Sequence, residues 1–87
     1  MIIEKKTWPL YFNRVLSGEK KLDLRVADFD ANIGDTLVLR EWDPETKQYT
    51  GRTLEKKITY VMRTKNAAKM YTSEDIEKYG FVVMQLE

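Results

Sequence analysis

Apolar side chains recur at helical spacing soon after the start of the chain and predict a first helix. Thr7 belongs to a residue type that caps helices, and Pro9 suits the first turn, where a missing N–H costs nothing. Gly18 supplies a C-terminal stop. Between these residues, four apolar positions share one helical face: Tyr11, Phe12, Val15 and Leu16.

Further along the chain, apolar and polar residues alternate with period two or form a short apolar run, which are the patterns of strands. The strands predicted in this way are residues 20–26, 36–42, 52–63 and 81–86. Turn residues at 32–35 and 43–47 separate them, and Gly51 stands where the return strand begins. Thr72 or Ser73 can cap a short helix that ends near Gly80.

These elements predict an α+β fold with one domain, residues 1–87. Many short strands with one early helix favour a small, partly open β-barrel of about five or six strands with two short helices. Its core is expected to contain the inward positions of the strands: Leu22, Leu24, Val26, Leu37, Leu39, Ile58, Tyr60, Val82 and Met84.

The composition restricts the chemistry. The chain has 87 residues, no cysteine and no histidine, which excludes Cys–His and Ser–His–Asp catalysis and the usual zinc ligands. We expect no metal and no cofactor. No apolar run is long enough for a membrane span, so we expect a cytoplasmic monomer that does not enter a membrane.

The formal net charge of +1 hides alternating blocks of charge. Residues 26–45 contain six acids and one basic residue, whereas residues 46–69 contain seven basic residues and one acid. Such alternation favours ion pairing across neighbouring strands. A protein that follows several phosphates usually carries an excess of basic charge, which this chain lacks.

The segment from Gly18 to Arg25 combines an ammonium, a carboxylate and a guanidinium. Asp23 and Arg25 share one face of the predicted strand and could bracket a polar ligand. Lys20 has the wrong parity for that face unless a turn or bulge redirects it. The alternative is a solvated face whose ion pairs each contribute under about 1 kcal/mol.

The pattern Gly-x-Lys-x-x-Glu-x-Arg after a first helix resembles the signature of the ASCH superfamily of PUA-like barrels. Gly18, Lys20, Asp23 and Arg25 meet it here, with Asp in place of Glu. Segments along nearly the whole chain look like a small bacterial and phage branch of that superfamily, in the same order: 6–12, 33–37, 39–43, 49–52 and 58–61.

The resemblance implies one of two functions. Some ASCH proteins are thought to bind RNA, and one group of similar size resembles amidohydrolases that remove the acyl group from N4-acylated cytidine. In that group a Lys, a Thr three residues later and a distant Glu form the catalytic set. Lys20 matches the Lys, Asp23 occupies the Thr position, and Glu74, Asp75 and Glu77 lie in the stretch of the distant Glu.

Two mechanisms remain open for an amidohydrolase. Neutral Lys20 could activate water while a carboxylic acid protonates the leaving amine. Alternatively, Asp23 acts as general base and protonated Lys20 stabilises the oxyanion, which suits a chain with Asp in place of the hydroxyl residue. Arg25 would orient Asp23 or hold the substrate carbonyl.

Trp8, Glu41 and Trp42 are candidate substrate-binding residues. Glu41 could pair with the exocyclic amine of a base while Trp42 stacks on its ring. The structural alternative for Trp42 is packing across a hairpin on Tyr49. Trp8 either fastens the helix start to the barrel or forms a wall of the cleft.

Three function classes therefore compete, and the sequence favours the first of them. The first is an amidohydrolase acting on N4-acylated cytidine or cytosine, with Lys20 and Asp23 at the reacting centre. The second is a non-catalytic module that binds RNA or a modified nucleotide, and the third is a protein-interaction module. The near-neutral charge favours a pocket for one nucleoside over a long RNA track.

Overall fold

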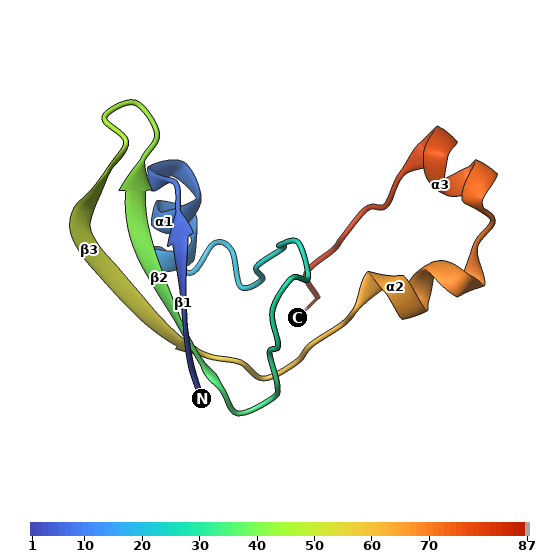
Figure 1. Cartoon of the computed structure of the whole chain (residues 1–87), viewed down its shortest axis with the longest axis horizontal. Helices are drawn as coiled ribbons and strands as arrows, with labels where there is room; N and C mark the ends of the chain where they lie inside the picture. Colours follow the sequence, from blue (N-terminus) through green and yellow to red (C-terminus); the bar gives the residue numbers. More distant parts are fainter. Residues whose placement is uncertain (87) are drawn as a thin grey trace.

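The computed structural model describes residues 1–86, with residues 66–68 as backbone only. Within them a three-stranded sheet has the order β1-β2-β3, formed by β1 (Ile2–Thr7), β2 (Thr36–Asp43) and β3 (Gln48–Lys57). β1 runs parallel to β2, and β3 pairs antiparallel with β2 through a tight hairpin. The fold is therefore α+β, built on an open mixed sheet (Figure 1).

Helix α1 (Pro9–Leu16) follows β1 directly and packs against β2. The C-terminal part of the chain contains α2 (Thr64–Ala67), a 3-10 turn (Ala68–Met70) and α3 (Ser73–Tyr79). α2 and α3 lie away from the sheet, and the chain then returns toward the loop that follows α1 (Figure 1). No helix in residues 1–86 is long and apolar enough to cross a membrane.

The core lies between α1 and the sheet. Phe12 and Val15 on one face of α1 pack against Leu39 at the centre of β2. Phe12 and Leu39 are each only 1% exposed. Leu37 and Leu54 extend this cluster from the two paired strands. A small core on one face of the sheet is consistent with the large number of exposed apolar residues elsewhere.

Several predicted elements are confirmed. The first helix, the strand at 36–42 and the last short helix are present at nearly the expected bounds. The hydroxyl of Thr72 accepts a hydrogen bond from the Asp75 amide at 3.1 Å and so caps α3. Thr7, however, does not cap α1: it ends β1 with a buried side chain, and Trp8 is the N-cap residue.

The predicted strand at 52–63 is wrong at both ends. β3 begins at Gln48 and ends at Lys57, so Gly51 lies inside the strand rather than at its start. Gly51 has a φ of 96°, which marks an irregularity in the ladder. Beyond Lys57 the chain leaves the sheet, so Tyr60 is exposed and Ile58 is only partly buried.

The strands predicted at 20–26 and 81–86 are also wrong in this structure, because neither segment has regular secondary structure. Leu24 is 67% exposed and Val82 77% exposed, whereas Leu22 is half-buried. The other predicted core residues of these segments, Val26 and Met84, are exposed too. Alternation defines an inward face only where a neighbouring strand supplies the ladder, and no ladder forms at either segment.

Candidate functional site

The end of α1 determines where Lys20 lies. Gly18 has a φ of 83°, in the left-handed region that glycine adopts most easily, and it turns the chain back on the helix. The Lys20 amide then donates to the Arg14 carbonyl at 2.9 Å and satisfies a free acceptor of the last helical turn. Lys20 is thereby held beside α1.

Lys20 lines a hollow of about 300 Å³ between the end of α1 and the last residues of the chain. The lining residues are Arg14, Glu19, Lys20, Leu22, Val83 and Gln85. The Lys20 ammonium lies 5.2 Å from the centroid of the Tyr11 ring. The Gln85 side-chain oxygen accepts a hydrogen bond from the Lys21 amide, which joins the two segments. Charged, amide, aromatic and apolar groups thus surround or adjoin one space.

Asp23 and Arg25 are bound to each other rather than arranged around a ligand. The Arg25 guanidinium pairs with the Asp23 carboxylate. It also donates to the Lys6 carbonyl at 3.0 Å and to the Thr7 hydroxyl at 2.8 Å. Arg25 therefore fastens the loop after α1 to the end of β1, and Asp23 shares in that contact.

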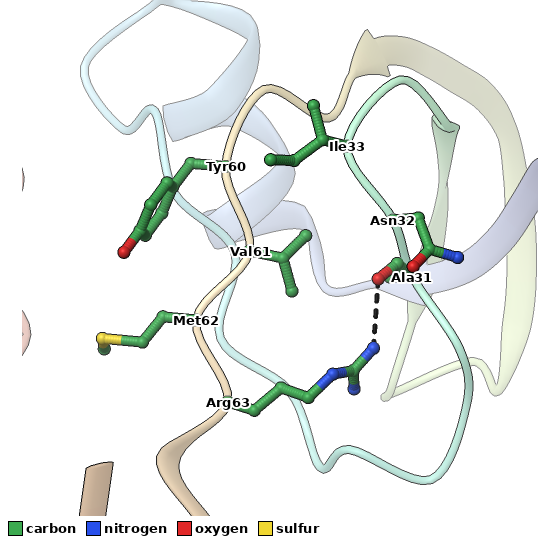
Figure 2. A pocket seen from close by; sticks show the side chains of 7 residues that line it. All are labelled: Ala31, Asn32, Ile33, Tyr60, Val61, Met62 and Arg63. Atoms are coloured by element: carbon green, nitrogen blue, oxygen red, sulfur yellow. Dashed lines mark hydrogen bonds between the residues drawn. The ribbon is translucent and has the colours of Figure 1, made fainter. Parts of the chain in front are cut away.

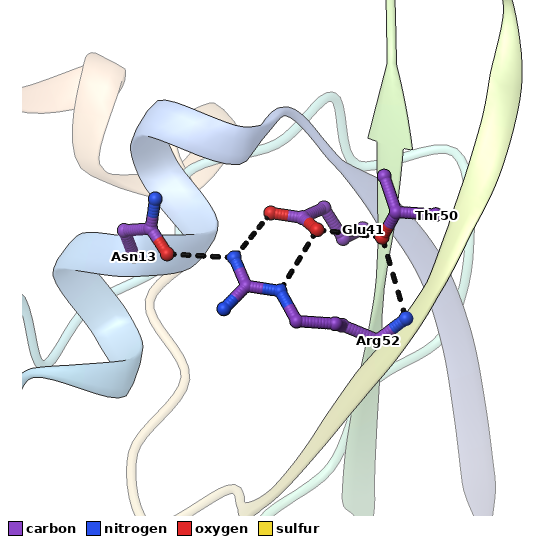
Figure 3. Close-up of polar contacts among 4 residues, drawn as sticks. All are labelled: Asn13, Glu41, Thr50 and Arg52. Atoms are coloured by element: carbon purple, nitrogen blue, oxygen red, sulfur yellow. Dashed lines mark hydrogen bonds and ion pairs between the residues drawn. The ribbon is translucent and has the colours of Figure 1, made fainter.

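Glu41 lies at the centre of a polar cluster between α1 and the hairpin (Figure 3). Arg40 faces Thr53 and Trp42 faces Tyr49, so residues 50–52 stand opposite Glu41 alone. Because of this bulge, two side chains of β3 reach the same carboxylate.

The Glu41 carboxylate accepts three hydrogen bonds from β3. It accepts hydrogen bonds from the Thr50 hydroxyl at 2.5 Å and from the Arg52 guanidinium at 2.9 and 2.6 Å. The same guanidinium donates to the Asn13 amide oxygen on α1 at 2.7 Å and lies over the Phe12 ring.

The electrostatics of this cluster indicate a structural pair. Glu41 is 4% exposed. Hydrogen bonds from Arg52 and then Thr50 lower the pKa of Glu41, although burial opposes the shift. The Glu41 carboxylate in turn raises the pKa of Arg52. A carboxylate so stabilised in its charged form is a poor general base, and its oxygens are not free for a substrate amine.

The remaining candidate residues do not converge on Lys20. Trp42 alternates with Glu41 along β2 and so lies on the opposite face of the sheet, where the Lys6 ammonium covers its ring at 4.5 Å. Trp8 is half-exposed at the start of α1. Glu74 belongs to the first turn of α3, as does Asp75, with Glu77 one turn later, and α3 lies far from α1 (Figure 1).

A second hollow, of about 520 Å³, separates the loop before β2 from the chain that follows β3 (Figure 2). Ile33, Tyr60, Val61 and Met62 give it a largely apolar lining. The Arg63 guanidinium bridges it by donating to the Ala31 carbonyl at 3.0 Å. Arg63, the cation in the lining of this second hollow, is therefore already hydrogen-bonded to the backbone.

The sequence reading missed the partners of Glu41 and most of the residues around Lys20. Arg52 could have been found, because a buried acid on β2 needs a cation from the basic block that forms the antiparallel neighbour. Gln85 carries no local signal, since only the return of the chain end brings it to Lys21. Among residues 1–86, no three acidic side chains gather in a way that could hold a metal ion.

The sequence of residues 2–85 matches the family described as "Domain of unknown function (DUF3850)". The chain belongs to the DUF3850 family. This DUF3850 domain is also similar to an uncharacterised 12.9 kDa protein in the GpA 3′ region of Escherichia phage P2. The two are 42% identical over 60 residues, which is 69% of this chain and 53% of the phage protein. The chain thus aligns with about half the length of that curated relative, and no solved structure matches it.

Proposed function

We propose that this domain is a binding module of the ASCH type that takes one nucleobase or nucleoside of the cytosine class in the hollow at Lys20. The observation that carries the proposal is Lys20, a half-buried residue that lines a small space with mixed polar and apolar walls. The resemblance of Gly18, Lys20, Asp23 and Arg25 to the ASCH signature supports the same location.

The size and lining of the hollow suit such a ligand. Its volume of about 300 Å³ is at the lower end of small-molecule sites and fits one base or nucleoside rather than an oligomer. Lys20 and Arg14 can donate to a ring carbonyl, and Glu19 can accept from an exocyclic amine. Leu22 and Val83 offer apolar contact to the ring faces.

The ion pair between Asp23 and Arg25 favours ligand binding over catalysis. In the mechanism with Asp23 as general base, its carboxylate must take a proton from water near the scissile amide. Here the Arg25 guanidinium holds that carboxylate and is itself anchored to Thr7 and the Lys6 carbonyl. Releasing Asp23 would therefore break a contact that ties the loop to the sheet.

Amide hydrolysis is the second candidate function, and one observation favours it. Glu19 and Lys20 line the same hollow, so an acid and a cation can face one ligand. In this version, Glu19, rather than Asp23, takes a proton from the attacking water while Lys20 stabilises the oxyanion of an N4-acylcytidine. The C–N4 bond then breaks as that proton passes to the leaving N4 amine, which releases cytidine and the carboxylic acid. Glu74 would take part only if α3 moved to the hollow.

The five- or six-stranded barrel implied by the resemblance forms, in this proposal, when a ligand is bound. The segments 20–26 and 81–86 already meet where the Lys21 amide contacts Gln85. A base in the hollow between them would favour their pairing into further strands. Slower hydrogen exchange of the amides in both segments on addition of cytidine is the expected result.

Lys20→Gln is expected to weaken the binding of cytidine by about 10- to 100-fold, because hydrogen bonds from a charged donor contribute about 1.5–3 kcal/mol. Isothermal titration calorimetry with cytidine, N4-acetylcytidine and adenosine measures the effect. Lys21→Gln is the matched control, since it removes the same charge from the adjacent exposed position. Equal losses in the two variants, or no binding of any cytosine derivative, would contradict the proposed pocket.

Turnover separates the two candidates. The protein is incubated with N4-acetylcytidine and N4-benzoylcytosine, and the release of cytidine or cytosine is followed by chromatography. Binding without release supports the non-catalytic module. Release that Lys20→Gln and Glu19→Gln abolish, and that Asp23→Asn leaves intact, supports the hydrolase with Glu19 as base.

A further inference from the structure

Four side chains form a strip on the face of the sheet that α1 does not cover. Leu39 and Glu41 point from β2 toward α1, so the alternating residues Arg40 and Trp42 point to the other face. Lys6 is the register partner of Arg40, and Tyr49 is the register partner of Trp42. Cross-strand partners share a face, so these residues, here called the aromatic strip, lie together: Lys6, Arg40, Trp42 and Tyr49.

Within the aromatic strip, each ring carries a cation. The Lys6 ammonium lies 4.5 Å from the centroid of the Trp42 ring, and the Arg40 guanidinium carbon lies 4.0 Å from that of Tyr49. The Tyr49 residue is 45% exposed, Lys6 is exposed, and Trp42 and Arg40 are half-buried. The strip is therefore a preformed, solvent-accessible surface with two planar rings and two positive charges.

Charge on this face is segregated along the strands. Glu4 and Glu55 lie on the same face, but they flank Val38, two residues before Arg40 on β2. The end of the sheet that holds the rings thus presents the cations of Lys6 and Arg40. In the described part of the chain α2 and α3 make no more than marginal contact with the sheet, so neither helix covers the strip.

We propose that the aromatic strip binds a single-stranded segment of nucleic acid. Unpaired bases can stack on Trp42 and Tyr49 or on the guanidinium plane of Arg40, while Lys6 and Arg40 contact the adjacent phosphates. A duplex keeps its bases stacked inside and cannot use the rings in this way. A second copy of the chain is disfavoured, because an isologous contact through the strip would bring its cations against one another.

The strip is separate from the hollow at Lys20, which lies at the end of α1, so this proposal stands independently of the proposed function. A strand bound at the strip and a base bound in the hollow use different residues. Substitutions in one site should therefore leave binding at the other unchanged.

Tyr49→Ala and Arg40→Gln are each expected to weaken binding of the full chain to a fluorescein-labelled oligouridine by about tenfold, through loss of a stacking partner or a phosphate contact. Fluorescence anisotropy measures the affinity, and labelled oligodeoxythymidine distinguishes RNA from DNA as the source of the strand. Arg40→Gln should also reduce the slope of log affinity against log salt by about 0.7, the value for one phosphate contact on a single strand.

Lys56→Gln is the matched control, because Lys56 pairs with Leu37 and so lies on the face toward α1. It removes one positive charge from β3 outside the strip, and the affinity should stay within about twofold of wild type, as is usual for distant surface changes. Cytidine binding and thermal unfolding of each variant show that the hollow and the fold remain intact.

Any of four binding results would overturn the proposal: unchanged affinity in both strip variants, an equal loss in Lys56→Gln, equal competition by duplex RNA, or equal competition by polyglutamate. The last would identify an acidic peptide as the occupant instead. A doubling of mass in light scattering that Tyr49→Ala abolishes would assign the strip to contacts between copies and would overturn the proposal as well.

Discussion

Leu39→Ala is expected to destabilise the fold by about 3 kcal/mol, within the range measured for buried leucines that leave a cavity. Leu39 is 1% exposed and packs against Phe12 and Val15, which leaves no room for the surroundings to collapse without moving α1. Small domains have only about 5–15 kcal/mol of stability in total. Urea unfolding followed by circular dichroism should show a large shift of the midpoint to lower denaturant.

Leu24→Ala is the matched control for this prediction. The sequence pattern places Leu24 in the core, whereas the structure leaves it 67% exposed. Its loss should therefore change the free energy of unfolding by less than about 0.5 kcal/mol, as for other surface substitutions. If Leu24→Ala costs as much as Leu39→Ala, residues 20–26 pack as a barrel strand in the free protein and the open sheet is wrong.

The elements that could be predicted are those whose local signals agree with their surroundings. The first helix has both an apolar face and a glycine stop, and β2 has an alternation that α1 covers on one side. The hairpin turn between Asp43 and Gln48 is likewise set by local residues. In each case the residues of the element itself carry the signal.

The elements that failed depend on distant partners. Residues 81–86 form an apolar run, which predicts a buried strand only if another strand is present to pair with it. β1 gave no strand signal of its own, yet its parallel pairing with β2 makes it one. The middle residues of β1, Glu4, Lys5 and Lys6, are all charged, so their own pattern shows no inward face. Only the pairing with β2 shows that Lys5 lies on the face toward α1 and that Glu4 and Lys6 lie on the opposite face.

The candidate site shows the same division. Chain reversal at Gly18 redirects Lys20 to the side of α1, as the sequence allowed, but Asp23 pairs with Arg25 because Thr7 and the Lys6 carbonyl anchor that guanidinium. The spacing of residues in the sequence predicts neither of these two hydrogen bonds of Arg25. The division of Glu41 and Trp42 between two faces follows from alternation alone, so a single cleft lined by both could have been rejected from the sequence.

Glu41→Ala is expected to destabilise the fold by about 2 kcal/mol. Removing one partner of a buried pair leaves the other uncompensated, which costs about 3–5 kcal/mol when both are buried. The Arg52 side chain is 48% exposed, so water recovers part of that loss. Glu45→Gln, which removes a carboxylate from the exposed hairpin turn, should leave the stability at neutral pH nearly unchanged.

Glu41→Gln tests the electrostatic part of this contribution through its pH dependence. The pKa of Glu41 is lowered by Arg52 and then Thr50 from its ordinary value of 4.5. A carboxyl group whose pKa is lower in the folded chain stabilises the fold above its unfolded pKa, and the contribution is lost as the pH falls through the folded pKa. Wild type should therefore be more stable than Glu41→Gln at neutral pH, and the difference should shrink steadily below about pH 4.5.

A second acid-sensitive contact, between the Met1 amino group and the Asp35 carboxylate, has to be separated from the titration of Glu41. Hydrogen bonds from the chain amino group and the Asn32 amide also lower the pKa of Asp35, so wild type and Glu41→Gln share that acid-sensitive contribution. Subtracting the two unfolding free energies at each pH removes it and leaves the titration of Glu41. A difference that stays constant from neutral to acidic pH would show that Glu41 acts through its shape and hydrogen bonds alone, and that the cluster with Arg52 is not held together by charge.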